Sequence, residues 1–196
     1  MLYDLFKVPL WQCDGAPFLP ESDDWFKNRE LFKNTGPHHG NLNTSLVSYG
    51  PVINHCRDLE LVSDEFKGFL LHNAKEFIDS IGYDTTGIEL KITSLWMNEM
   101  LSDSFHNVHS HYGNIISGCF YIELPANCAG ISYESFLTRF DKVQLEIKEH
   151  NLYNSQSWTI APNKGDVFMW ESYIKHFVQP SQFDGVRKTV AFDIGW

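Results

Sequence analysis

The sequence predicts a mainly β protein with an N-terminal helix (an α+β chain) whose strands form an antiparallel sandwich or jelly roll. Three observations support this fold class. Apolar residues recur every three or four positions over residues 63–81, and the pattern stops at Gly82. The spacing then changes to two, and six or more short strand-like runs follow without a helical segment between them. Consecutive strands without intervening helices favour antiparallel sheets.

The N-terminal region carries few periodic signals. Residues 4–11 predict a short opening strand. Residues 14–55 are rich in Gly, Pro, Asn and Asp, most clearly in GPHHGNLN, and these residue types favour turns. We therefore expect loops and one short helix before the first long element.

The strongest helix signal covers residues 63–81. Ser63 can cap the first turn, and Asp64 and Glu65 place negative charge at the helix N-terminus, where it is stabilising. Gly82 is a typical residue after the end of a helix. One face must pack on a large apolar surface, because it carries Phe66, Phe69, Leu70, Ala74, Phe77, Ile78 and Ile81.

The strands are predicted from alternation and from turn residues. Apolar and polar residues alternate over 88–93, the pattern of a half-buried strand. Turn-forming residues such as Pro125 and Gly165 separate the later runs. These further strands are predicted at 116–124, 130–136, 143–149, 157–161, 166–171 and 187–194.

Composition and charge exclude several classes of protein. A chain of 196 residues fits one domain, and 43% hydrophobic residues suffice for a packed core. The net charge of −10 argues against nucleic-acid binding and against docking on anionic membranes. Without a signal peptide, an 18-residue apolar stretch or a C-x-x-C pair, we expect a cytoplasmic protein that has no structural zinc knuckle or disulfide scaffold.

Two histidines in FHNVHSHYGN carry a candidate metal site. His109 and His111 are two residues apart, so they share one face of a strand, with Cα atoms roughly 6.5–7 Å apart. Two imidazoles on one face can converge on one ion. His106 has the opposite parity and is left out. The alternative is a polar loop with incidental histidines.

A third histidine and an arginine follow near the C-terminus. His176 comes after a strongly apolar strand, and Arg187 comes eleven residues later. Strand parity places Arg187, Thr189 and Ala191 on one face, where a guanidinium and a hydroxyl can bind a carboxylate. The alternatives are a half-buried structural His176 and a surface Arg187 paired with Asp184 or Asp193.

In combination, these segments resemble a known family. The chain is similar to the Fe(II)/2-oxoglutarate oxygenases related to prolyl 4-hydroxylases, in particular to a 2OG-Fe(II) oxygenase subgroup. The likeness is strong over most of 88–196 and loose before it. The segments that carry it are VPLW, SLWMNEM, HNVHSHYGNIISGCFYIELPANCAGISY, PNKGDVFMWESYIKHFVQP and VRKTVAFDIGW.

The resemblance implies a fold, a domain plan and cofactors. It implies a double-stranded β-helix (jelly-roll) core with one long supporting helix packed on it. Residues 1–196 would form a single domain, with N-terminal loops and the helix in 1–86 and the catalytic core in 87–196. Fe(II), 2-oxoglutarate as co-substrate and O2 would support hydroxylation of an unactivated C–H bond, with release of succinate and CO2. The expected partner is a small-molecule or peptide substrate, and the aromatic N-terminus could also support a homodimer.

The resemblance also implies residue roles. His109 and His176 match the two metal-binding histidines, and His111 stands where the wider superfamily usually has Asp or Glu. The remaining matches concern 2-oxoglutarate. Tyr121 would supply a hydroxyl for its distal carboxylate, Arg187 a salt bridge to the same group, and Thr189 a second hydroxyl beside them. Asn98 would supply an amide near the metal-bound end.

A third histidine in place of a carboxylate keeps other readings open. Three neutral imidazoles leave one more positive charge on the ion than two imidazoles and a carboxylate, and Glu99 or Asp103 could complete the set instead. A three-histidine zinc or cupin-type hydrolase, lyase or isomerase is the alternative enzyme. A metal-free jelly roll that serves only in binding or structure is the third reading.

Overall fold

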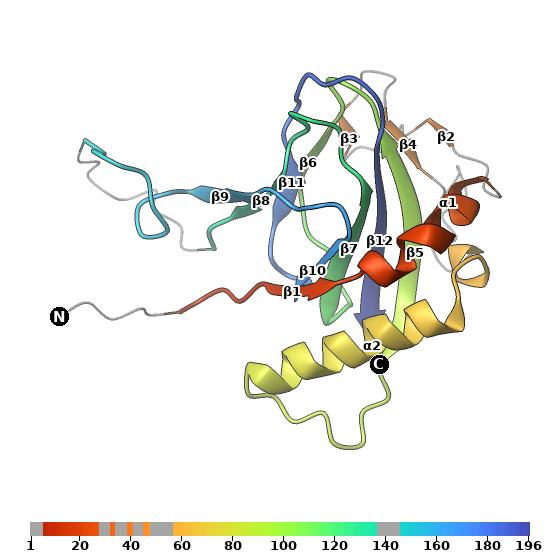
Figure 1. Cartoon of the computed structure of the whole chain (residues 1–196). Helices are drawn as coiled ribbons and strands as arrows, with labels where there is room; N and C mark the ends of the chain where they lie inside the picture. The colour runs from red at the N-terminus through yellow and green to blue at the C-terminus, as the bar shows by residue number, and fades with distance from the viewer. Residues whose placement is uncertain (1–5, 28–31, 34–38, 41–44, 48–56, 137–145) are drawn as a thin grey trace.

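Two antiparallel sheets form the body of the protein (Figure 1). The computed structural model describes residues 6–27, 32–33, 39–40, 45–47, 57–136 and 146–196. The large sheet contains, in spatial order, β1 (Trp11–Asp14), β10 (Asp166–Glu171), β7 (Ile116–Glu123), β12 (Arg187–Gly195), β5 (Lys91–Met100), β4 (Ser45–Val47) and β2 (Phe32–Lys33). The small sheet contains β3 (His39–Gly40), β6 (Phe105–His109), β11 (His176–Val178), β8 (Ile131–Glu134) and β9 (Ser157–Ile160). This arrangement confirms the predicted mainly β jelly roll.

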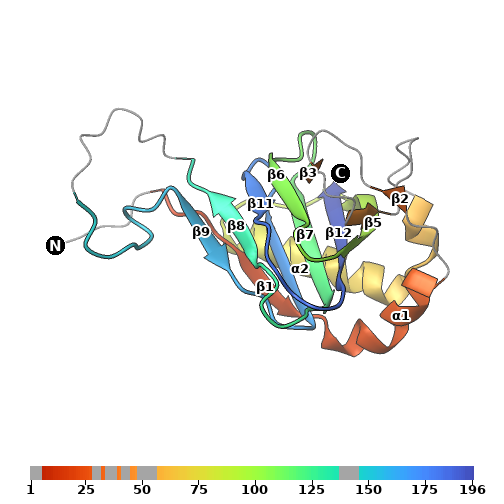
Figure 2. The same cartoon turned by 90° about the horizontal axis from the view of Figure 1, so that it is seen from above.

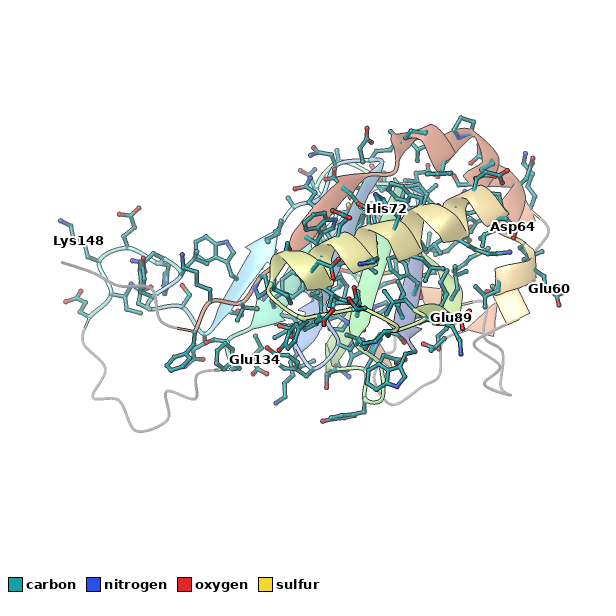
Figure 3. The ribbon with its side chains drawn as sticks, turned by 90° about the horizontal axis from the view of Figure 1, so that it is seen from below. Glu60, Asp64, His72, Glu89, Glu134 and Lys148 are labelled. Atoms are coloured by element: carbon teal, nitrogen blue, oxygen red, sulfur yellow. The ribbon has the colours of Figure 1, made fainter. Side chains whose placement is uncertain are left out.

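The long helix forms where the sequence predicts it. Helix α2 (Asp64–Ser80) begins after Ser63, whose hydroxyl accepts a hydrogen bond from the Phe66 amide at 3.1 Å. It ends before Gly82, which adopts a positive φ of 94° that glycine tolerates without strain. Figure 1 shows α2 running across one side of the large sheet. Figure 3 shows Asp64 at the beginning of the helix and His72 further along it.

The main core lies between α2 and the large sheet. Phe66 is fully buried and its ring centroid lies 5.3 Å from that of Phe120 on β7. Helix α1 (Leu19–Lys27) follows the 3-10 turn η1 (Ala16–Phe18). It contributes Trp25, whose ring centroid lies 4.9 Å from that of Phe66. The 3-10 turn η2 (Arg57–Glu60) leads into α2. Strands β5 and β12 complete this core with Leu95, Met97, Val190, Phe192 and Ile194.

The opposite face of the large sheet lines a second, smaller interior. Side chains alternate across a strand, so Phe120 and Ile122 belong to the main core while Cys119 and Tyr121 point to the other side. There they join Ile131, Phe168, Trp170 and Ile174. This interior also contains buried polar residues, and it is where the candidate site lies.

Several predicted boundaries were wrong. The opening strand, predicted at 4–11, pairs with β10 from Trp11 to Asp14; residues 6–10 form no strand, and residues 4–5 lie outside the described residues. Strand β5 begins at Lys91, since the Ile88 amide closes a turn onto the Thr85 carbonyl. Of the strand predicted at 143–149, residues 146–149 form no strand and 143–145 lie outside the described residues. The short strands β6 and β11 were not predicted as elements.

Strands β8 and β9 extend away from the body as a ribbon (Figure 2). Besides the backbone pairing, the hydroxyls of Ser132 on β8 and Thr159 on β9 form a hydrogen bond of 2.7 Å. In the part of the chain that the structure describes, none of the helices combines the length and apolar character that a membrane span requires.

Candidate metal centre and co-substrate site

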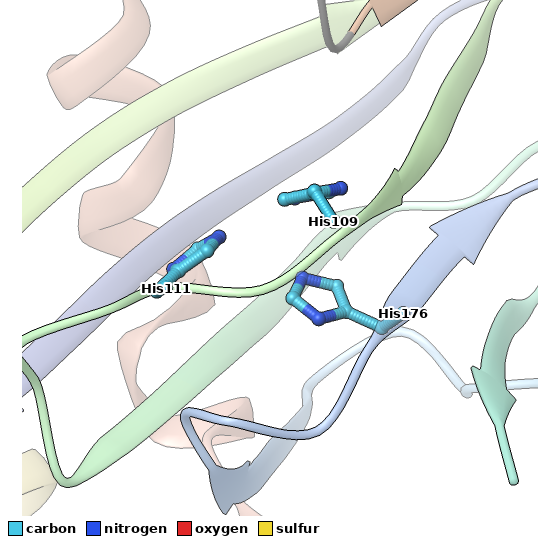
Figure 4. Close-up of side chains that lie close together, drawn as sticks. All are labelled: His109, His111 and His176. Carbon is cyan, nitrogen blue, oxygen red and sulfur yellow. The ribbon is translucent and has the colours of Figure 1, made fainter. Parts of the chain in front are cut away.

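Three histidines converge at the junction of the two sheets (Figure 4). His109 ends β6 and lies opposite His176, the first residue of β11, in the antiparallel register. His111 follows β6 by two residues, and its amide donates to the Ser172 carbonyl at 3.0 Å. The ring centroids lie 4.3 Å apart for His109 and His176, 5.2 Å for His109 and His111, and 5.1 Å for His111 and His176. The predicted convergence is therefore present.

Each of the three rings is oriented by a hydrogen bond at Nδ1. The acceptors are the Asn107 carbonyl for His109 at 2.7 Å and the Ile174 carbonyl for His176 at 3.1 Å. For His111 the acceptor is the Asp193 carboxylate at 2.6 Å. These oxygens can only accept, so Nδ1 carries the hydrogen and Nε2 keeps its lone pair. All three rings thus offer Nε2 as a metal ligand.

The cluster fits a single metal ion. One nitrogen from each ring lies within 4.8 Å of those from the other two, so small ring rotations bring all three to roughly 2 Å from one ion. Burial, followed by the proximity of His109 and His111, holds the pKa of His176 well below its ordinary value. A neutral His176 keeps its lone pair for a metal. Three imidazoles leave further coordination positions open.

The other candidate ligands lie outside this cluster. His106, Glu99 and Asp103 do not belong to the group of converging side chains among the described residues. Glu99 instead approaches Lys188 to 4.0 Å. The structure therefore corrects the suggestion that Glu99 or Asp103 completes the ligand set.

A buried cation lies beside Tyr121 in the same interior. Arg187 is only 3% exposed, so the alternative of a surface arginine was wrong. Its guanidinium lies 5.5 Å from the Tyr121 ring centroid and donates to the Met100 sulfur at 3.2 Å. In the described part of the chain Arg187 makes no ion pair, and its Nε has no hydrogen-bond partner. A buried charge left unpaired is costly, so the surroundings of Arg187 fit an anionic ligand.

The strand register brings the other predicted residues to the same place. Thr189 on β12 lies between Asn98 on β5 and Tyr121 on β7, forming one row across the sheet. Within the described residues, the Tyr121 hydroxyl and the Asn98 side-chain oxygen are buried without hydrogen-bond partners. Burial raises the pKa of Tyr121 well above its usual range, so its hydroxyl stays protonated and can donate to a carboxylate.

Aromatic residues form part of the wall of this interior. The ring centroid of Trp170 lies 4.7 Å from that of His176, and the ring centroid of Trp96 lies 5.5 Å from that of His111. Tyr133, which the sequence did not single out, pairs with His176 in the register between β8 and β11. Its buried hydroxyl lacks a hydrogen-bond partner among the described residues, as does the Trp170 indole nitrogen.

Sequence reasoning also missed a polar group behind His111. Asp193 accepts hydrogen bonds from His111 and from the Ser117 hydroxyl, the latter at 2.7 Å. Strand parity could have identified Asp193, because it shares the face of β12 that carries Arg187 and Thr189. Ser172 completes the group, with its hydroxyl 2.8 Å from that of Ser117.

The comparison with protein families decides the assignment. A family model described as "Putative 2OG-Fe(II) oxygenase" matches residues 94–193, which include all three histidines and Arg187. The chain belongs to this family. Fe(II) and 2-oxoglutarate are accordingly its metal and co-substrate, and the histidine cluster can bind the iron.

Solved structures with low sequence identity share the fold. A 2OG-Fe(II) oxygenase family oxidoreductase from Burkholderia pseudomallei has a TM-score of 0.59 at 16% identity, covering 95% of this chain and 84% of that one. A prolyl-4-hydroxylase from Pseudomonas putida has a TM-score of 0.57 at 11% identity, with coverages of 96% and 92%. HygX from Streptomyces hygroscopicus, solved with nickel, 2-oxoglutarate and hygromycin B, also has a TM-score of 0.57 at 11% identity, with coverages of 96% and 83%. A sequence comparison with curated proteins finds no match.

Proposed function

We propose that this family member is an Fe(II)- and 2-oxoglutarate-dependent dioxygenase that hydroxylates an unactivated C–H bond of a small-molecule or peptide substrate in the cytoplasm. One observation carries the proposal. Three imidazoles that offer Nε2 to one ion lie in the same interior as a buried arginine without a carboxylate partner among the described residues. A metal and a dicarboxylate together account for both features.

In this proposal each group of residues has a defined task. His109, His111 and His176 hold the iron, which when bound supports oxidation of the substrate by O2 coupled to conversion of 2-oxoglutarate to succinate and CO2. The protein side chains position the reactants and exclude water from them. The buried aromatic rings of Trp170 and Phe168 contribute to that exclusion, because each is at most 2% exposed.

The co-substrate is held by the row of residues around Arg187. The guanidinium pairs with the distal carboxylate of 2-oxoglutarate, and the hydroxyls of Tyr121 and Thr189 donate to the same group. Asn98, in the same row, is proposed to contact the co-substrate nearer its metal-bound end. Binding would supply the partners that Arg187, Tyr121 and Asn98 lack within the described residues.

A three-histidine zinc enzyme remains the second candidate function. The ligand set favours it, since three histidines and a water form a familiar catalytic zinc site. That function gives no role to the buried Arg187 or to the Tyr121 hydroxyl, which has no hydrogen-bond partner among the described residues, whereas a dicarboxylate explains both.

Anaerobic titration of the purified protein distinguishes the two candidates. Fe(II) and 2-oxoglutarate should together produce the weak visible charge-transfer absorption of a ferrous 2-oxo acid chelate. The Arg187→Ala variant should need about 100-fold more 2-oxoglutarate for the same absorption, because it loses a buried charge pair. Stoichiometric zinc and no response to 2-oxoglutarate would support the zinc enzyme instead.

Lys188→Ala is the matched control for this experiment. Lys188 is the next residue on β12 and points to the other side, where it approaches Glu123 to 3.4 Å. Its removal changes the charge of the strand by the same amount without touching the interior. Equal loss of 2-oxoglutarate binding in both variants would contradict the proposed role of Arg187.

A further inference from the structure

We propose that Asp193 is a positioning residue for His111 and supplies, through that imidazole, the negative charge that an aspartate or glutamate ligand would otherwise bring to the iron. This inference rests on the proposed function. His111 differs from the other two histidines in its Nδ1 partner. Backbone carbonyls orient His109 and His176, whereas a carboxylate orients His111.

The surroundings hold Asp193 in one position. The residue is 5% exposed, and the oxygen that accepts from His111 also accepts from the Ser117 hydroxyl at 2.7 Å. Ser117 lies directly across from Asp193 in the register between β12 and β7. The pairing of β12 with β5 is irregular immediately after Asp193, so the strand is locally distorted at this position.

Backbone hydrogen bonds fix the rest of the group. The His111 amide donates to the Ser172 carbonyl, and the Ser172 amide donates to the Ile115 carbonyl at 2.9 Å. The Ile115 amide in turn donates to the Ile194 carbonyl at 2.9 Å, next to Asp193. His111 and Asp193 are thus connected both through side chains and through this chain of amides. A rigid, buried carboxylate is what a ring needs to keep one orientation.

Two consequences follow for the ion. The carboxylate accepts from Nδ1, which leaves Nε2 of His111 facing the other two rings. It also places a negative charge one imidazole away from the metal, where the charge can offset part of the positive charge of the ion. The Asp193 carboxylate therefore compensates part of the positive charge of the three-histidine iron site without being a ligand of the iron.

Asp193→Asn is the first test, because asparagine preserves size and one acceptor oxygen while removing the charge. We expect Fe(II) affinity to fall 10- to 100-fold, the range for loss of a group that supports a metal ligand. The charge-transfer absorption with 2-oxoglutarate should move to shorter wavelength, because a more positive iron gives up electron density less readily. Loss of packing alone would not produce that spectral shift.

Glu123→Gln is the matched control. Glu123 is a carboxylate on the same sheet, at the end of β7, and it pairs with Lys188 rather than with a histidine. The control should keep the metal affinity and the spectrum of the unaltered protein. If Asp193→Asn behaves like Glu123→Gln in both measurements, Asp193 has no such role. If the unaltered protein itself binds no Fe(II) or 2-oxoglutarate, the proposed function fails instead.

A measurement on the unaltered protein covers the case in which Asp193→Asn does not fold. In protein loaded with the diamagnetic probe Zn(II), nitrogen-15 NMR should show His111 coordinating through Nε2, with a slowly exchanging proton on Nδ1. Ser117→Ala, a milder change, should speed that exchange and weaken metal binding less than Asp193→Asn. Coordination of His111 through Nδ1, or rapid exchange of its Nδ1 proton in the unaltered protein, would overturn the inference.

Discussion

The two sheets differ in how their residues are used. The large sheet is buried on both sides, with α2 against one face and the polar interior against the other, and its strands β5 and β12 have 10 and 9 residues. The small sheet has strands of 2 to 5 residues and carries exposed apolar side chains such as Val108 and Trp158. Yet two of the three metal-site histidines, His109 and His176, come from the small sheet.

This difference indicates a division of labour. The proposed co-substrate residues Asn98, Tyr121, Arg187 and Thr189 all belong to the large sheet, whose positions are fixed by a deep core. The small sheet has shorter strands, and its two metal-site histidines are oriented by hydrogen bonds at Nδ1. We therefore expect core variants in the large sheet to change stability, and variants of the two histidines in the small sheet to change metal binding.

The largest expected effect is on the small sheet. His176→Ala removes one of three ligands and should abolish stoichiometric metal binding, measured by metal analysis after dialysis. His72→Ala is the control, because His72 is an exposed histidine on α2 (Figure 3). The melting temperature of the metal-free His176→Ala protein should stay close to that of the control. Retention of metal by His176→Ala would break the proposed division.

A core variant of the large sheet should have the opposite effect. Phe120 is fully buried and packs on Phe66, so Phe120→Ala should lower the free energy of unfolding by about 3–5 kcal/mol. Trp158→Ala, on the small sheet at 41% exposure, should cost less than about 1 kcal/mol. Urea unfolding of the metal-free proteins measures both. Equal losses would show that the two sheets contribute alike.

Two glycines provide the smallest and sharpest comparison. A methyl group at Gly118 on β7 would meet the Phe192 ring and the Phe168 carbonyl, so Gly118→Ala should cost about 1–3 kcal/mol. Gly68 lies within α2 with open space around it, so Gly68→Ala should stabilise the protein by about 0.5–1 kcal/mol. Thermal unfolding monitored by circular dichroism checks both signs. Stabilisation by Gly118→Ala would contradict the packing described for β7.

The sequence predicted the parts of the fold that depend on local patterns. Helix α2 and strands β7, β10 and β12 have strong periodicity and flanking turn residues, and they form close to the expected positions. Strands β6 and β11 have 5 and 3 residues and little periodicity, so pairing with each other, rather than composition, defines them. Short paired strands of this kind cannot be found from one segment alone.

The same distinction applies to the site. His109 and His111 could be grouped from the sequence because a spacing of two fixes their shared direction. The contact between Asp193 and His111 joins residues that are 82 positions apart in the sequence, so no local pattern contains it. Tyr133 likewise reaches the site only through the pairing of β8 with β11. The co-substrate roles of Asn98, Tyr121, Arg187 and Thr189 stay predictions.

Strand β12 links folding to chemistry through its alternation. Val190, Phe192 and Ile194 pack into the main core, while Arg187, Thr189 and Asp193 face the polar interior. A shift of one residue in the strand register would exchange the two sets and move the charged side chains of Arg187 and Asp193 into the main core under α2. Packing of the main core therefore requires the correct register of β12. The same register places Arg187, Thr189 and Asp193 in the polar interior, so folding also positions the proposed site residues.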